Sequence, residues 1–78
     1  MIIEEKYGND YYGNLVIENY PNLQSIVVKE KSLQNLNSLK ICNCEKLNTI
    51  FFDFDTLKNV KNVVIESIYI NDLIILSS

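Results

Sequence analysis

A chain of 78 residues is long enough for one small domain, which buries only about 60% of the surface that its unfolded form exposes. With 47% hydrophobic and 22% charged residues, it has the composition of a folded protein rather than of a linker or a disordered tail. The net charge is −3, and all seven cationic residues are lysines spread along the chain. No basic stripe results, so we expect no nucleic-acid partner.

The N-terminal segment, MIIEEKYGND, turns acidic at Glu4. It lacks the basic start and the apolar core of a signal peptide. Near the other end, the longest apolar run is LIIL at residues 73–76, which is far too short to span a bilayer. We therefore expect no membrane span and, if the chain is complete, a cytoplasmic or otherwise intracellular location.

From Gly13 onward the sequence repeats with an offset of 24 residues. Residues 13–36 read GNLVIENYPNLQSIVVKEKSLQNL, and residues 37–60 read NSLKICNCEKLNTIFFDFDTLKNV. The identical pairs are Leu15/Leu39, Ile17/Ile41, Asn19/Asn43, Leu23/Leu47, Ile26/Ile50, Leu33/Leu57 and Asn35/Asn59. Residues 61–78 match the start of a unit once one residue is deleted from its turn. We therefore divide one domain into an N-terminal segment (1–12, with Ile2 aligned to Ile26 as a leading half-repeat), two repeats (13–36 and 37–60) and a partial repeat (61–78).

Each unit begins with an alternating segment, LVIE, LKIC or VVIE, which is typical of a short half-buried strand. Because the copies recur in one direction, neighbouring strands are predicted to pair in parallel. The returning halves carry IVV, IFF and LII, which favour a second short strand, and Ser32 and Thr56 are predicted to cap a tight helical turn. The predicted inward columns are Leu15/Leu39/Val63, Ile17/Ile41/Ile65, Leu23/Leu47/Ile70 and Ile2/Ile26/Ile50/Leu73. Stacking of such units builds one continuous core.

The same offset places charged residues of opposite sign beside each other on the returning face. The predicted charge columns are Glu5/Lys29/Asp53, Lys31/Asp55 and Lys6/Glu30. Exposed pairs of this kind contribute about 0–1 kcal/mol each. We interpret Asp53 and Asp55 as part of this ion-paired surface rather than as a catalytic pair. Since the chain has no His and therefore no Ser/His/Asp set, we predict that it is not an enzyme.

Both cysteines lie in the segment ICNCEKL, one residue apart. The strand pattern places Cys42 on the outward column, whereas the repeat motif that this segment resembles implies that Cys44 points inward, so the two thiols are predicted to diverge. Zinc takes about four ligands, and the chain has no His and no third Cys. We therefore predict structural cysteines, no metal and no cofactor; a metal site would need ligands from a second chain.

Two segments resemble the conserved half of a leucine-rich repeat. Residues 36–47 fit L-x-x-L-x-I-x-x-C-x-x-L, and residues 60–70 fit the shorter L-x-x-L-x-L-x-x-N-x-L with Ile68 at the Asn site. The chain is thus similar to the leucine-rich repeat family in its cysteine-containing variant, as a short array or a fragment. This resemblance implies an α/β, mostly β, right-handed solenoid with a short parallel sheet on one face and short strands or helical turns on the other.

The resemblance also implies a non-catalytic module that binds another protein through the exposed face of its sheet. The residues expected to make contact are Val16, Glu18, Asn19, Lys40, Cys42, Asn43, Val64 and Glu66. A second reading stays open, in which the chain is a structural segment of a longer array with no separate activity.

The two ends of the array raise separate expectations. Tyr7, Tyr11 and Tyr12 are expected to cover the first rung. The last rung ends in YINDLIILSS, and no further unit is predicted to cover its apolar residues Ile70, Leu73, Ile75 and Leu76. An uncovered strand edge invites pairing with another chain, so we expect self-association through the C-terminal end.

Overall fold

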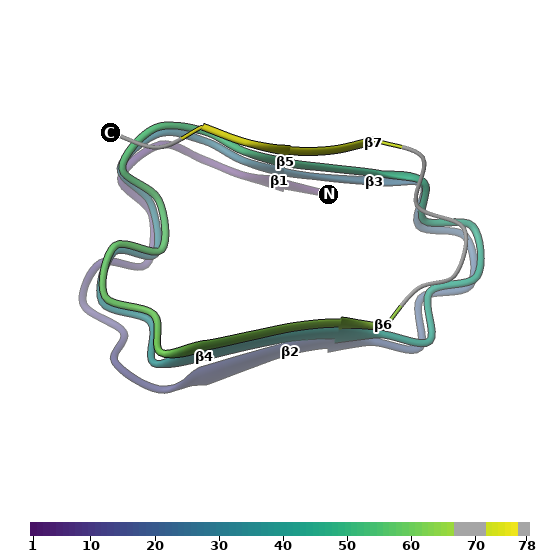
Figure 1. Ribbon diagram of the computed structural model, residues 1–78, viewed down its shortest axis with the longest axis horizontal. Coiled ribbons are helices and arrows are strands. Elements are labelled where there is room, and N and C mark those ends of the chain that lie inside the picture. Colours follow the sequence, from purple (N-terminus) through teal and green to yellow (C-terminus); the bar gives the residue numbers. More distant parts are fainter. Residues whose placement is uncertain (67–71, 77–78) are drawn as a thin grey trace.

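A computed structural model describes residues 1–66 and 72–76 of the chain, and its secondary structure consists of short strands. The strands are β1 (Ile2–Ile3), β2 (Asn14–Glu18), β3 (Ser25–Val28), β4 (Ser38–Cys42), β5 (Thr49–Phe52), β6 (Asn62–Glu66) and β7 (Asp72–Ile75). They form a four-stranded sheet in the order β1-β3-β5-β7 and a three-stranded sheet in the order β2-β4-β6. The chain crosses from one sheet to the other after each strand, and the two sheets face each other as two layers (Figure 1).

Every strand pairing is parallel, as the repeat predicts. In the three-stranded sheet, Leu15 pairs with Leu39 and Leu39 with Val63, each 24 residues further along. In the four-stranded sheet, Ile26 pairs with Ile50 at the same offset, and Ile50 pairs with Leu73. This last offset is one residue shorter, which confirms the deletion in the final unit. Ile70 lies outside the described residues.

The predicted alignment of the first strand is wrong by one residue. Ile2 pairs with Val27 rather than Ile26, and Ile3 pairs with Val28. A shift of one residue exchanges the two faces of a strand, so Ile2 is 60% exposed while Ile3 packs against the core.

The one-residue shift of β1 against β3 also changes which charged residues lie beside each other after these strands. Glu4 stands next to Lys29, with 3.3 Å between Lys29 Nζ and Glu4 Oε2. Both side chains are substantially exposed, so the pair contributes little to stability. None of the ion pairs predicted at an offset of 24 forms among residues 1–66, and that prediction is wrong.

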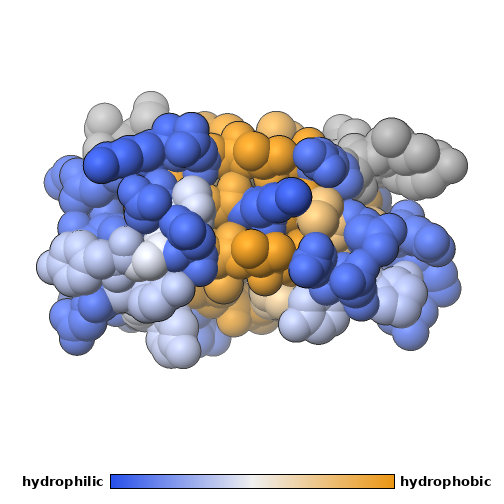
Figure 2. Space-filling model, turned by 90° about the horizontal axis from the view of Figure 1, so that it is seen from below, coloured by the Kyte–Doolittle hydropathy of each residue, from blue (hydrophilic) through white to orange (hydrophobic). Residues whose placement is uncertain are grey.

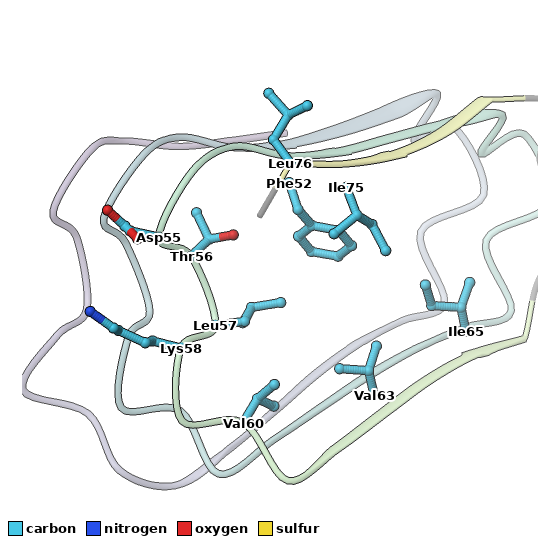
Figure 3. A pocket seen from close by; sticks show the side chains of 10 residues that line it. All are labelled: Phe52, Asp55, Thr56, Leu57, Lys58, Val60, Val63, Ile65, Ile75 and Leu76. Atoms are coloured by element: carbon cyan, nitrogen blue, oxygen red, sulfur yellow. The ribbon is translucent and has the colours of Figure 1, made fainter. Parts of the chain in front are cut away.

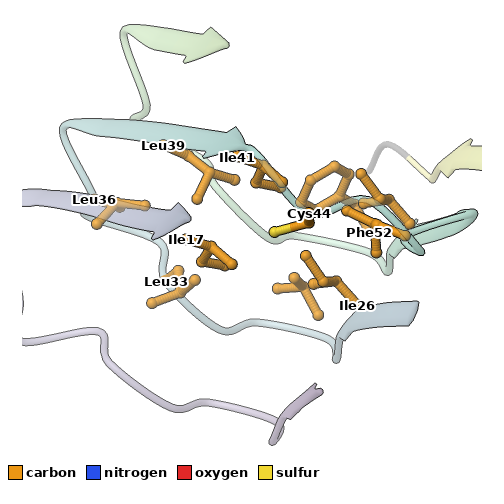
Figure 4. Packing of buried hydrophobic residues seen from close by; sticks show 11 residues of the cluster. Ile17, Ile26, Leu33, Leu36, Leu39, Ile41, Cys44 and Phe52 are labelled. Atoms are coloured by element: carbon orange, nitrogen blue, oxygen red, sulfur yellow. The ribbon is translucent and has the colours of Figure 1, made fainter. Parts of the chain in front are cut away.

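The core lies between the two sheets and draws on both of them. Its buried members are Ile17, Ile26, Val28, Leu33, Leu36, Leu39, Ile41, Cys44, Leu47, Ile50 and Phe52 (Figure 4). The most complete burial is in the middle of the stack, where each side chain has a neighbour from the preceding and the following unit. Val63 and Leu73 belong to the same inward columns but remain 44% and 48% exposed, because no described strand lies beyond β6 or β7.

The connections after β3 and β5 contain single residues in the left-handed conformation and end in one tight turn each, in which Leu36 N–H donates to the Leu33 carbonyl at 3.3 Å and Val60 N–H to the Leu57 carbonyl at 3.2 Å. Ser32 and Thr56 do not cap this turn as predicted. Ser32 Oγ donates to the Lys29 carbonyl at 2.7 Å, and Thr56 Oγ1 donates to the Asp53 carbonyl at 2.9 Å. A helix cap would instead accept a hydrogen bond from a later N–H group. Positive φ angles recur at equivalent positions of these turns: Lys6, Lys31 and Asp55 (57–59°), then Gly8, Leu33 and Leu57 (51–72°).

These left-handed positions lead to a test of the turn. The Lys31 side chain is exposed and its φ is 59°, a conformation that costs a non-glycine residue roughly 1–2 kcal/mol. Lys31→Gly is therefore expected to raise the free energy of unfolding by about 1 kcal/mol, measured by urea denaturation. Lys46→Gly is the control, because Lys46 is also exposed but lacks a positive φ. It is expected to lower stability by roughly 0.5–1 kcal/mol, and a loss of equal size in both variants would contradict the turn geometry.

Candidate interaction surface

The outer face of the β2-β4-β6 sheet has a central column formed by Val16, Lys40 and Val64, which pair in that order. Val16 is 49% exposed and Val64 is 41% exposed. Both valines point outward because their neighbours Leu15, Ile17, Val63 and Ile65 in the same strands point toward the core. Figure 2 shows this face as an apolar band between hydrophilic margins, with one hydrophilic side chain lying across its middle.

One margin of this band is a row of hydrogen-bonding side chains at the start of the strands. Asn14 Oδ1 accepts hydrogen bonds from Ser38 Oγ at 2.7 Å and from Asn37 Nδ2 at 2.9 Å. Asn62 occupies the corresponding position of β6 and is exposed. Neutral polar groups, rather than charges, therefore border the band on this side.

The opposite margin is acidic. Glu18, Cys42 and Glu66 are aligned by the strand register, and both glutamates are exposed. Cys42 Sγ donates to Glu18 Oε2 at 3.5 Å. The face thus carries two carboxylates at one edge and the single ammonium group of Lys40 near its centre.

Cys42 departs from the prediction that it would be an exposed contact residue. Its side chain lies in the outward column but is only 9% exposed, with Glu18 and Glu66 as its neighbours in the row. Burial, followed by the hydrogen bond and the charge of Glu18, raises the pKa of the Cys42 thiol above its ordinary value, and the charge of Lys40 acts in the opposite direction. We therefore assign Cys42 a supporting place between the glutamates instead of a contact role.

The raised pKa can be tested by alkylation. At a given pH a higher pKa leaves less of the reactive thiolate, so Cys42 is expected to react slowly with iodoacetamide at pH 8. Glu18→Gln removes a charge that raises the pKa and should speed the reaction, whereas Lys40→Gln removes a charge that lowers it and should slow the reaction. Mass spectrometry of the Cys42 adduct over time gives both rates. If the two variants shift the rate in the same direction, the electrostatic assignment is wrong.

The strands of this face end at a pair of asparagines in the left-handed conformation. Asn19 and Asn43 have φ angles of 62° and 53°, values that asparagine adopts more readily than most residues. Asn43 Nδ2 donates to Asn19 Oδ1. Together with Pro21 and Glu45 they line a shallow hollow of about 220 Å³. Both asparagines are exposed beside the acidic margin, where the prediction places them.

The remaining chemically active residues do not come together. Cys44 is buried and its Sγ donates to the Cys42 carbonyl at 3.4 Å, and both cysteines are free. Asp53 Oδ1 accepts from its own neighbour, the Phe54 N–H, at 2.7 Å. Across residues 1–66 and 72–76, no three His, Cys, Asp or Glu side chains cluster in a way that could hold a metal ion.

A second apolar column was missed by sequence reasoning. It lies on the outer face of the β1-β3-β5-β7 sheet and follows the register Ile2, Val27, Phe51 and Ile74. Ile2 and Ile74, at the two edges, are 60% and 45% exposed. The runs IVV, IFF and LII contained the signal, since every residue in them is apolar and a strand must send its middle one outward.

The N-terminal tyrosines cover the first rung only in part. Tyr7 and Tyr11 line an apolar hollow of about 480 Å³ at this end, together with Ile3, Leu15 and Leu33. Tyr12 does not line it and is 69% exposed.

Comparison of the chain with known protein families, proteins and structures identifies no relative. No protein-family model matches the chain, and no curated protein and no solved structure matches it. In the part of the chain that the structure describes, no helix is long and apolar enough to cross a membrane.

Proposed function

We propose that the chain is a short solenoid of the leucine-rich-repeat type that binds another protein and catalyses no reaction. The 24-residue register of the β2-β4-β6 sheet supports the repeat, and the motif in residues 36–47 supports the family. The strands of the second sheet take the place of the helices found in many repeat proteins.

The observation that carries the binding role is the exposure of two apolar side chains, Val16 and Val64, on either side of Lys40 on the outer face of the β2-β4-β6 sheet. Exposed apolar side chains surrounded by polar groups are typical of surfaces that bind other proteins. The acidic margin formed by Glu18 and Glu66 favours a partner that presents lysine or arginine beside an apolar patch, because complementary charge speeds association and sets orientation.

Site-directed photo-crosslinking tests this proposal. A photoreactive residue in place of Lys40, at the centre of the band, should capture a partner from cell extract, which is then purified and titrated against the chain. The double variant Val16→Glu, Val64→Glu should weaken its binding by roughly 30-fold or more, as expected for the centre of an interface.

The matched control is Ile2→Glu, Phe54→Glu, which places the same charges on exposed apolar residues outside the β2-β4-β6 sheet. Circular dichroism first verifies that both double variants are folded. Equal loss of binding in the two variants, or no effect of the Val16 and Val64 pair, would contradict the proposed surface.

The second function, a structural segment of a longer array, rests on a different observation. Among the described residues, β2 and β6 pair on one side only, as do β1 and β7, so both ends of the stack are open to further repeats. This reading would be favoured by two results together. The source gene would encode further 24-residue repeats on both sides of the chain, and the Val16→Glu, Val64→Glu variant would bind the captured partner as tightly as the unchanged chain does.

A further inference from the structure

The C-terminal end of the stack has an exposed apolar surface with a stepped shape. The β1-β3-β5-β7 sheet has four strands and the facing β2-β4-β6 sheet has three. Within residues 1–66 and 72–76, β7 is the last strand of one sheet, and β6 pairs with β4 alone. A hollow of about 370 Å³ lies there, lined by side chains that include Val63, Ile65, Ile75 and Leu76 (Figure 3).

A second copy of the same chain fits this step. The two sheets are traversed in opposite directions (Figure 1). A two-fold rotation about an axis parallel to the strands exchanges the sheets and reverses the order of stacking. It therefore places β7 of the second copy beside β6 of the first, in antiparallel orientation, and β6 of the second copy beside β7 of the first. Each combined sheet then contains the four strands of one copy and the three strands of the other, with no gap.

We propose that two copies of the chain form a two-fold dimer through this antiparallel pairing of β6 with β7. Residues 67–71 join the end of β6 to the start of β7, so Glu66 and Asp72 lie at the same end of their sheets. The rotation places Asp72 of the second copy opposite Glu66 of the first copy. This pair fixes the register between β7 of the second copy and β6 of the first. The resulting pairs are Ile65 with Leu73, Val64 with Ile74 and Val63 with Ile75.

This register covers the apolar side chains that the end of the stack leaves exposed. The inward residues Val63, Leu73 and Ile75 are 44%, 48% and 64% exposed in the single chain, and each pairs with another inward residue. The outward residues Val64 and Ile74, 41% and 45% exposed, pair with each other. These five side chains expose roughly 400 Å² per copy, about half of the ~800 Å² that each partner contributes to a standard interface. Leu57, Val60, Leu76 and the strand backbones add to it.

The N-terminal end has the same step but is better covered. There the inward residue Ile17 is 3% exposed, and Ile3 and Leu15 are partly buried. Tyr7, Gly8 and Tyr11 contribute to the lining of the hollow at that end. A head-to-tail stack that pairs β7 with β1 of the next copy leaves a gap one strand wide between β6 and the next β2. The head-to-tail stack that pairs β6 with β1 and β7 with β2 leaves no gap, but it must use the better covered N-terminal end and continues without limit. The C-terminal two-fold uses the exposed end only and closes after two copies.

Sedimentation velocity of the 78-residue chain from about 1 μM to 1 mM tests the dimer. The expected result is a concentration-dependent equilibrium of monomer and dimer that stops at the dimer. Ile74→Lys, which places a charge at the centre of the pairing, should abolish the dimer. The control Ile2→Lys, in the same outward column at the other edge of the sheet, should leave it intact.

Asp72→Lys is a variant expected to gain affinity. It replaces the like charges of Glu66 and Asp72 by an opposite pair, twice in each dimer, and should tighten dimerisation roughly three- to tenfold. A chain that stays monomeric throughout the range, an assembly that grows beyond the dimer, or equal effects of Ile74→Lys and Ile2→Lys would overturn the proposal.

Cysteine cross-linking tests the register itself. A chain with Val64→Cys and Ile74→Cys should form a covalent dimer on mild oxidation, because directly opposed residues of antiparallel strands are close enough for a disulfide. Within one chain these two positions point outward on opposite sheets and cannot bond to each other. The same pair of changes at Val16 and Ile2, at the other end of the stack, should give no covalent dimer, and the reverse pattern would place the interface at the wrong end.

Discussion

Ile41→Ala is expected to lower the free energy of unfolding by about 2–5 kcal/mol, the range for truncating a large side chain in a packed core. Ile41 is fully buried in the middle strand of the β2-β4-β6 sheet, with Ile17 on one side and Ile65 on the other. Because a domain of this size has a total stability of the same order, the variant should be largely unfolded in buffer. Circular dichroism during urea denaturation gives the loss.

Lys40→Ala is the matched control, since Lys40 precedes Ile41 in the same strand and points to solvent. An exposed substitution away from special contacts changes stability by about 0.5 kcal/mol or less. Losses of similar size at Lys40 and Ile41 would mean that the inward and outward faces of this strand are wrongly assigned.

The second large effect concerns the other sheet. Phe52→Ala is expected to cost about 3–5 kcal/mol, because Phe52 is 2% exposed and packs between Val28 and Ile75 in the inward column of the β1-β3-β5-β7 sheet. Phe51→Ala removes the same side chain from the outward face of the same strand, where it is only partly buried, and should cost clearly less. Thermal or urea denaturation of both variants decides the point; a greater loss at Phe51 would reverse the faces of β5.

The parallel register was predictable because identical residues mark it. Leu15/Leu39 and Ile17/Ile41 each combine an apolar type with a position on the strand, so an offset of 24 satisfies the alternation and the identities together. Parallel pairing follows, since copies that recur in one direction cannot pair as hairpins.

The first strand was misaligned because it offers too little sequence to define an offset. MII fits Val27 and Val28 as well as it fits Ile26 and Val27, and only the turn that follows decides between them. That turn spans residues 4–13 and contains Gly8 at φ 72°, at the position that Leu33 and Leu57 hold in later turns. An offset of 25 there was not visible from apolar positions alone.

The left-handed residues of the turns and the absence of a helix cap escaped prediction for a related reason. Ser32 and Thr56 precede apolar residues, as helix-capping residues do, yet Leu33 and Leu57 adopt positive φ angles that leucine rarely takes. The stacking of equivalent turns imposes this conformation: Lys31 N–H donates to the Phe54 carbonyl at 2.9 Å and Leu33 N–H to the Tyr7 carbonyl at 2.8 Å. Hydrogen bonds between units therefore decide the turn, and local propensity does not reveal them.

The sequence predicted which strand residues of the candidate surface point outward, but not how much of Cys42 is exposed. Alternation correctly puts Val16, Lys40 and Val64 outward, because it depends only on strand geometry. Alternation does not predict how much of the small Cys42 side chain is covered by Glu18 and Glu66, which lie on either side of it. For the same reason it gave the direction of Val63 and Leu73 but not their exposure, which depends on what lies beyond the last strand.

The most direct test of the whole account is a measurement of which backbone protons lie next to each other. In a nuclear Overhauser spectrum of the monomeric chain, parallel strands should give contacts between Val16 and Lys40 and between Lys40 and Val64, and the first strand should give contacts between Ile2 and Val27. Hairpin-type contacts between β2 and β3 or between β4 and β5, in place of those contacts 24 and 25 residues apart, would contradict the stacked parallel sheets and every proposal built on them.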